Sequence, residues 1–264
     1  MTADEHVQAG RLEEALSVLQ DSVRKQPGDA RLRAFLFQLL CVLGQWERAL
    51  NQLDVLSGLK SESILIARVY QAAIRGEVHR AEVFAGKRSP VIFGEPSEWM
   101  SWLVHAGQLV AQGEHAAAAE LRDKAFDAAP ATPGAADGVA FAWIADADPR
   151  LGPVAEVILD GTYYWVPFSR IKSVEFPAPK DLRDLVWCQA TFTWTNGGQA
   201  AGFIPVRYPG TDSMADGALR LSRKTEWQQT PAGYSLGLGQ RLWATDQADL
   251  PLLEIRKLEL NPAG

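Results

Sequence analysis

The sequence predicts an α+β protein, with a helical N-terminal domain over residues 1–135 and a mainly antiparallel, β-rich domain over residues 136–264. Residues 1 to about 130 are rich in Ala, Leu, Glu, Gln and Arg, which favour helices. From about residue 139 the chain is rich in Val, Ile, Tyr, Trp, Phe and Thr, which favour strands. Pro130, Pro133 and Gly134 lie between these two halves, and such a cluster of helix- and strand-breaking residues indicates a boundary.

A repeat with a period near 34 residues organises the helical half. The segment Gly10–Leu16 recurs as Gly44–Leu50, and further copies begin at Gly76 and Gly113, with steps of 34, 32 and 37 residues. Each glycine is followed five residues later by an alanine. Glycine ends the first helix of a hairpin because it tolerates a left-handed conformation, and the alanine lets the second helix approach closely. The pattern resembles the tetratricopeptide repeat, and we expect four such tetratricopeptide-like hairpins, the first of them truncated. The expected helices span 3–9, 11–25, 30–43, 45–58, 62–75, 77–87, 96–112 and 114–128.

Short runs separated by turn residues build the β-rich half. Asp160 and Gly161 separate the runs 154–159 and 162–168, and Asn-Gly dipeptides and Asp-Gly dipeptides between such runs predict hairpins. A second hairpin is expected from the runs 186–195 and 199–206. The remaining expected elements are strands at 171–176, 225–229, 234–244 and 252–260, a helical turn at 180–185 and a short helix at 214–222. Many short strands with few helices are typical of a compact antiparallel sheet.

Composition and charge exclude several classes of function. The 264 residues carry a net charge of −6, and when the chain is split at residue 135 each half carries −3, which argues against nucleic acid as a partner. Cys41 and Cys188 stand far apart and in no Cys-x-x-Cys motif, as in a reduced cytoplasmic protein. The N-terminus lacks the pattern of a signal peptide, and no apolar run is long enough to insert into a membrane.

The sequence offers one weak candidate for chemistry. Asp146, Asp148 and Glu156 are a possible carboxylate cluster for a metal- or nucleotide-dependent enzyme. The structural interpretation is stronger, with Asp148 capping a turn and Asp146 pairing with Arg150. No His-Glu-x-x-His or Gly-x-Ser-x-Gly motif is present, and the glycines near residue 238 lack a phosphate-binding Lys-Ser/Thr pair. We therefore predict no catalysis and no cofactor, and expect Cys188 to be buried and inert.

Five strings in the C-terminal half are long and unusual: Gly152–Phe168, Leu182–Trp187, Phe203–Tyr208, Arg223–Trp227 and Gly239–Arg241. Together with the degenerate repeats before them, they resemble the ImpE/TagJ family, accessory proteins of bacterial type VI secretion clusters. The resemblance implies a non-catalytic cytosolic adaptor that binds the small sheath subunit TssB through that subunit's N-terminal helix. It also implies a link to the sheath-recycling AAA+ ATPase ClpV. A helical-repeat scaffold for an unrelated partner remains an alternative.

Two surfaces compete as the site for an amphipathic partner helix. One is the concave face of the repeats, lined by Leu36, Phe37, Leu40, Ile66, Val69, Tyr70, Trp102 and His105. The other is the surface where the β-rich half meets the repeats. We favour the second, because several of the repeat residues must pack between helices, and because a partner bound only to the repeats would leave the aromatic half without a role. Arginine beside aromatic residues is also common interface chemistry. The partner-binding residues predicted there are Tyr163, Trp165, Trp187, Arg207, Arg223 and Trp227.

Overall fold

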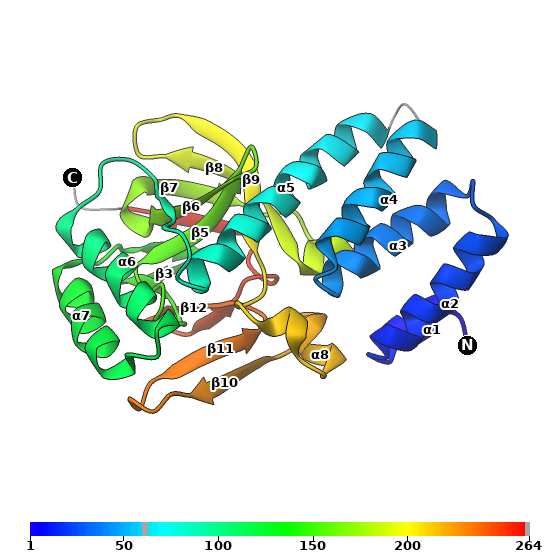
Figure 1. Cartoon of the computed structure of the whole chain (residues 1–264). Helices are drawn as coiled ribbons and strands as arrows, with labels where there is room; N and C mark the ends of the chain where they lie inside the picture. Colours follow the sequence, from blue (N-terminus) through cyan, green and yellow to red (C-terminus); the bar gives the residue numbers. More distant parts are fainter. Residues whose placement is uncertain (60–62, 262–264) are drawn as a thin grey trace.

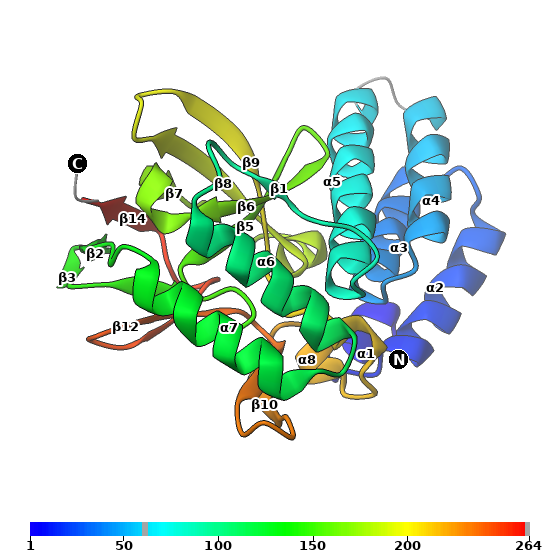
Figure 2. The same cartoon turned by 60° about the vertical axis from the view of Figure 1, so that its left-hand side comes forward.

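A computed structural model describes residues 1–59 and 63–261 of the chain (Figure 1). Helices α2, α3 and α4 form a row at one end of the molecule, and the strands gather at the other end. The long helix α5 runs from that row onto the sheet (Figure 1), and α6 and α7 lie side by side in front of the strands (Figure 2). Residues of α5 and α6 share one hydrophobic cluster with the sheet residue Trp165, so these two helices cover the same face of the sheet.

Three predicted helical hairpins form as expected. They are α1–α2 (Ala3–Gln8, Leu12–Lys25), α3–α4 (Ala30–Val42, Trp46–Leu59) and α6–α7 (Glu98–Ala111, His115–Ala128). The first helix of each hairpin ends two residues before Gly10, Gly44 or Gly113, glycines with φ angles of 73°, 68° and 83°. These left-handed angles explain why glycine recurs at the equivalent place in each hairpin.

The prediction of a helix break at Gly76 is wrong. Helix α5 runs without interruption from Ser63 to Phe84, and Gly76 is buried within it. A Cβ atom at Gly76 would lie 2.6 Å from Cγ2 of Ile158, so the glycine allows α5 to pack closely on the sheet. The predicted helices 62–75 and 77–87 are thus one element, whose expected first residue, 62, lies outside the described residues.

The main sheet has the strand order β1-β6-β5-β9-β8-β7-β14-β2-β3, and all neighbours are antiparallel except β1 and β6. Both predicted hairpins form within it, as β5–β6 and β8–β9. Its strands are β1 (Val91–Ile92), β2 (Gly134–Ala136), β3 (Val139–Phe141), β5 (Val154–Leu159), β6 (Thr162–Pro167), β7 (Ile171–Glu175), β8 (Trp187–Trp194), β9 (Gln199–Pro205) and β14 (Lys257–Leu260).

Two small sheets and several short helices complete the chain. β4 (Ile144–Asp146), β12 (Leu242–Thr245) and β13 (Asp249–Pro251) form one small sheet, and β10 (Thr225–Gln229) and β11 (Ser235–Gly239) form the other. The short helices are η1 (Phe168–Arg170), η2 (Leu182–Leu185), η3 (Thr211–Ser213) and α8 (Gly217–Arg220). The predicted strand 234–244 is therefore two strands in different sheets. The chain turns between them because Gly239 has a φ of 85° and Arg241 points into the interior.

One hydrophobic cluster joins the two halves of the chain. It contains Leu39 and Tyr70 from the helices together with Tyr163, Trp165 and Trp187 from the sheet. A second cluster, which includes Phe192 and Trp243, fills the opposite side of the strands. Strand β2 spans residues 134–136, and the proposed division of the chain into domains 1–135 and 136–264 stays a prediction. None of the helices described has both the length and the apolar character to cross a bilayer.

Candidate functional site

Three of the four aromatic residues predicted to bind a partner, Tyr163, Trp165 and Trp187, lie in the core between α5 and the sheet. Tyr163 and Trp165 are two residues apart on β6 and therefore share the face that α5 covers. The Trp165 indole donates a hydrogen bond to the Tyr163 hydroxyl (2.7 Å), which in turn donates to Glu156. Trp187 is also fully buried, and its indole donates to Glu77 of α5 (3.1 Å). In this structure, these side chains hold α5 on the sheet and present no surface to a partner.

Both predicted arginines, Arg207 and Arg223, contact the ends of repeat helices. Arg223 donates to the carbonyl oxygens of Gln8 (2.7 Å) and Val7 (3.2 Å), at the end of α1. Arg207 donates to those of Val42 (2.6 Å) and Cys41 (3.3 Å), at the end of α3. Val7 and Gln8 precede Cys41 and Val42 by 34 residues, so the two arginines bind equivalent carbonyl pairs in consecutive repeats.

These contacts have a physical cause in the helices themselves. The last carbonyls of a helix lack partners within it, and the helix dipole favours a positive charge there. The Arg207 side chain is buried and also donates to the Arg220 carbonyl (3.0 Å), whereas Arg223 is exposed. The β-rich half therefore engages each of the first two repeats through a guanidinium group.

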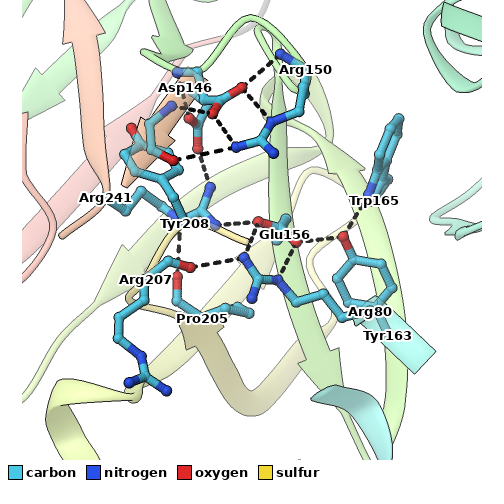
Figure 3. A network of polar contacts seen from close by, with 12 residues as sticks. Arg80, Asp146, Arg150, Glu156, Tyr163, Trp165, Pro205, Arg207, Tyr208 and Arg241 are labelled. Atoms are coloured by element: carbon cyan, nitrogen blue, oxygen red, sulfur yellow. Dashed lines mark hydrogen bonds and ion pairs between the residues drawn. The ribbon is translucent and has the colours of Figure 1, made fainter. Parts of the chain in front are cut away.

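A buried ionic network connects α5 with the sheet (Figure 3). Arg80 of α5 donates to Glu156 of β5 from Nε (2.6 Å) and Nη2 (3.2 Å), and to Glu77 from Nη1 (2.7 Å). Arg241 reaches Glu156 from the other side and also pairs with Asp146. Burial alone would raise the pKa of Glu156, but the Arg80 and Arg241 charges and the hydrogen bonds outweigh burial and hold that pKa at about 2. Glu156 is therefore an anion held between two cations.

The expected pairing of Asp146 with Arg150 is wrong. Arg150 pairs with Asp148 (2.5 Å), and the Asp148 carboxylate also accepts the backbone N–H of Arg150 (2.9 Å), which confirms the predicted turn cap. Asp146 lies deeper, against Arg241, and burial raises its pKa to about 7. Within the described ranges 1–59 and 63–261, no three His, Cys, Asp or Glu side chains are grouped to hold a metal ion. The arginines thus engage all three carboxylates of the candidate cluster.

Of the six predicted contact residues, Trp227 on β10 combines an aromatic side chain with exposure, at 40%. It packs on Tyr208, with ring centroids 5.7 Å apart. Cys188 is buried as expected, and burial raises the pKa of its thiol to about 12. On the competing repeat face, Leu36, Phe37, Leu40 and Tyr70 are buried, whereas Ile66, Val69 and His105 are exposed. The partner-binding role of the six residues stays a prediction.

A groove opens where α5 leaves the sheet, and we call it the α5–sheet groove. It has a volume of about 360 Å³, and its walls are Val69, Ala72 and Ala73 of α5 and residues of β8 and β9 such as Ala190 and Phe203. Ile66 and Leu65, one turn earlier on α5, are 49% and 72% exposed. The sequence placed Val69 among candidate contacts on the repeats but gave no signal that it faces β9, because that contact depends on how α5 lies across the sheet.

Helical hairpins joined to an antiparallel sheet through buried arginines define this chain as a repeat protein with a fused β-rich domain. Residues 6–72 match a tetratricopeptide repeat family, and residues 138–259 match the ImpE protein family. The chain is 49% identical over 262 residues to a Pseudomonas aeruginosa protein named type VI secretion system accessory component TagJ, covering 99% of this chain and 92% of the relative. The chain therefore belongs to the ImpE/TagJ family.

A solved structure has the same fold. The X-ray crystal structure of protein VPA1032 from Vibrio parahaemolyticus superimposes with a TM-score of 0.89 at 26% sequence identity, covering 98% of this chain and 97% of that chain. The predicted α+β class, with tetratricopeptide-like repeats followed by a mainly antiparallel β-rich part, is confirmed.

Proposed function

We propose that this protein is a non-catalytic adaptor of a bacterial type VI secretion system that works in the cytoplasm. The name and the similarity of the Pseudomonas aeruginosa relative support a role in that system. The helical repeats support an adaptor role, because stacked repeats commonly serve as surfaces for protein partners. Within this role we expect the chain to bind the N-terminal helix of the small sheath subunit TssB and to work with a ClpV-type AAA+ ATPase.

The α5–sheet groove is the observation that carries the proposal for the TssB helix. An amphipathic helix needs an apolar trough that its large side chains can enter. Small residues, among them Ala72, Ala190 and Gly202, form much of the groove wall and allow a helix backbone to approach closely. The exposed aliphatic residues Leu65, Ile66 and Val69 continue one wall along α5 beyond the sheet. Gln189, Thr191 and Asp160 provide a polar edge.

A charge placed in the groove tests this assignment. Val69→Asp puts a carboxylate on the apolar wall, and we expect it to weaken binding of a synthetic TssB N-terminal helix by about 2 kcal/mol or more, the effect of a binding hot spot. Val78→Asp is the matched control, because Val78 lies on the same helix with similar exposure, 44% against 41% for Val69. The two residues are nine positions apart and thus face opposite sides of α5. Isothermal titration calorimetry measures both affinities.

Each outcome of this titration has a distinct meaning. If Val69→Asp binds as the wild type does, the groove is not the site, and Trp227→Ala then tests the exposed predicted contact. If the wild-type protein does not bind the TssB helix, the partner assignment is wrong and the chain is a repeat scaffold for another protein. A pull-down of ClpV with and without bound TssB helix tests the second part of the proposal.

A further inference from the structure

A second pocket lies far from the α5–sheet groove, between two strands that each stand at the edge of a sheet. β3 is the last strand of the main sheet, and β13 is the last strand of the three-stranded sheet. The pocket between them, which we call the β3–β13 pocket, has a volume of about 360 Å³. Figure 2 shows β2, β3 and β12 at the left of the molecule and α4 and α5 at the right. A partner in this pocket leaves the α5–sheet groove free.

The floor and one wall of the β3–β13 pocket are apolar. Phe141 and Ile255 are buried at its base, and Val139, Leu250 and Pro251 stand at its sides. Val139 is 63% exposed, so its side chain is open to a partner. The volume accommodates one or two large side chains of a partner, which is the arrangement of an anchor residue in an interface pocket.

The rim of the pocket is acidic. Asp137, Asp249 and Glu254 line it, and none of the lining residues is a lysine or an arginine. Asp137 accepts the backbone N–H of Lys257 (2.7 Å), whereas Asp249 and Glu254 are exposed and take part in no ion pair among the described residues. The two cations that follow Ile255 in the sequence have other contacts: Lys257 pairs with Glu259 (2.8 Å), and Arg256 donates to the Ile255 carbonyl (2.6 Å).

We propose that the β3–β13 pocket binds a protein segment that carries a large apolar anchor residue flanked by lysine or arginine. The anchor enters the space between Val139 and Leu250, and the flanking cations meet Asp249 and Glu254. Apolar burial supplies the affinity, and the acidic rim selects basic partners over acidic ones. An adaptor with two separate pockets is able to hold two partners at once, yet this inference stands independently of what binds the α5–sheet groove.

Synthetic peptides test the proposal directly. The probe is a capped hexapeptide Lys-Lys-Trp-Leu-Lys-Lys, and the matched controls are Glu-Glu-Trp-Leu-Glu-Glu and Lys-Lys-Gly-Ser-Lys-Lys. Titration into the full-length, ¹⁵N-labelled protein is followed by NMR. We expect saturable shifts at the amides of Val139, Ala248 and Leu250 with the first peptide, and affinities weaker by about tenfold or more for the two controls.

Charge reversal on the protein provides the second arm of the experiment. The double variant Asp249→Lys/Glu254→Lys is expected to bind the basic peptide with an affinity lower by about tenfold or more. The control Glu14→Lys reverses an exposed charge on α2 and is expected to change that affinity by less than about twofold. Both variants alter exposed side chains, and their thermal unfolding midpoints check the fold.

Three results overturn the proposal. The first is the absence of saturable shifts at these amides with the basic peptide. The second is equal binding of the acidic peptide. The third is a concentration-dependent dimer, seen by analytical ultracentrifugation and abolished by Val139→Glu, which assigns the pocket to a second copy of this chain. Because none of these readouts involves the α5–sheet groove, failure here leaves the proposed TssB site untouched.

Discussion

Replacing Glu156 with glutamine tests the buried ionic network. The Glu156 carboxylate accepts two hydrogen bonds from Arg80, one from Arg241 and one from Tyr163, and neither it nor the two arginines has appreciable exposure. The glutamine side chain removes the negative charge and turns an N–H group toward one of these donors. Removing one charged partner of a buried ion pair destabilises a protein by about 3–5 kcal/mol, and here a single anion is paired with two cations. We therefore expect a loss at or above the upper end of that range, out of a total stability of about 5–15 kcal/mol.

Urea unfolding at pH 7, followed by tryptophan fluorescence and circular dichroism, measures this loss. The control is Glu226→Gln, which removes one of the two exposed carboxylate partners of Lys224 and is expected to lower the free energy of unfolding by less than about 1 kcal/mol. Tyr163→Phe removes the hydrogen bond to Glu156 and the acceptor of the Trp165 indole N–H, and its loss of stability should fall between those of the two variants. If Glu156→Gln costs no more than Glu226→Gln, the network does not hold α5 on the sheet and our account of the core is wrong.

Three further predictions follow from described contacts. Arg207→Ala leaves buried carbonyls without donors and should lower the free energy of unfolding, measured with urea, by about 2–4 kcal/mol. Arg223 is exposed, so Arg223→Ala should lower it by about 1 kcal/mol or less, and equal losses would contradict the difference in burial. Gly76→Val forces a side chain against Ile158 and should lower the free energy of unfolding by about 1 kcal/mol or more; a smaller loss would contradict the close contact. The stability difference between wild type and Glu156→Gln should be constant above pH 4.5 and shrink as the pH falls toward 2, because the folded state depresses that pKa; a constant difference at pH 3 would refute this.

Elements defined by neighbouring residues were predictable from the sequence. The β5–β6 hairpin follows from Asp160-Gly161, since Asp160 adopts a φ of 48° and Gly161 one of 81°, conformations that these residue types tolerate. Gly76 shows the limit of such inference. It occupies the same place in the sequence repeat as Gly44, yet it serves close packing against Ile158, a residue 82 positions later. The sequence pattern of the helix alone does not distinguish the two uses of glycine.

The prediction for the contact residues had a different weakness. Arginine and aromatic residues are common in protein interfaces, and they are also common where two halves of one chain meet. The alternation along β6 indicated that Tyr163 and Trp165 share a face, but their burial depends on α5, which the sequence predicted as two shorter helices. The α5–sheet groove was unpredicted for the same reason, because it exists only where a continuous α5 passes the end of the sheet.

The arginine contacts to the repeats have a consequence for how this family evolves. Arg207 and Arg223 bind backbone carbonyls, which every residue possesses, so side chains within the repeats are free to change without loss of these bonds. The spacing is not free, because the two guanidinium groups match carbonyl pairs one repeat apart. In an open repeat array each unit contacts only its neighbours, so no contact fixes the number of units. In this chain the β-rich half holds Arg207 and Arg223 at a spacing that fits two consecutive repeats. Related proteins should therefore vary widely in repeat sequence while keeping the number of N-terminal hairpins constant.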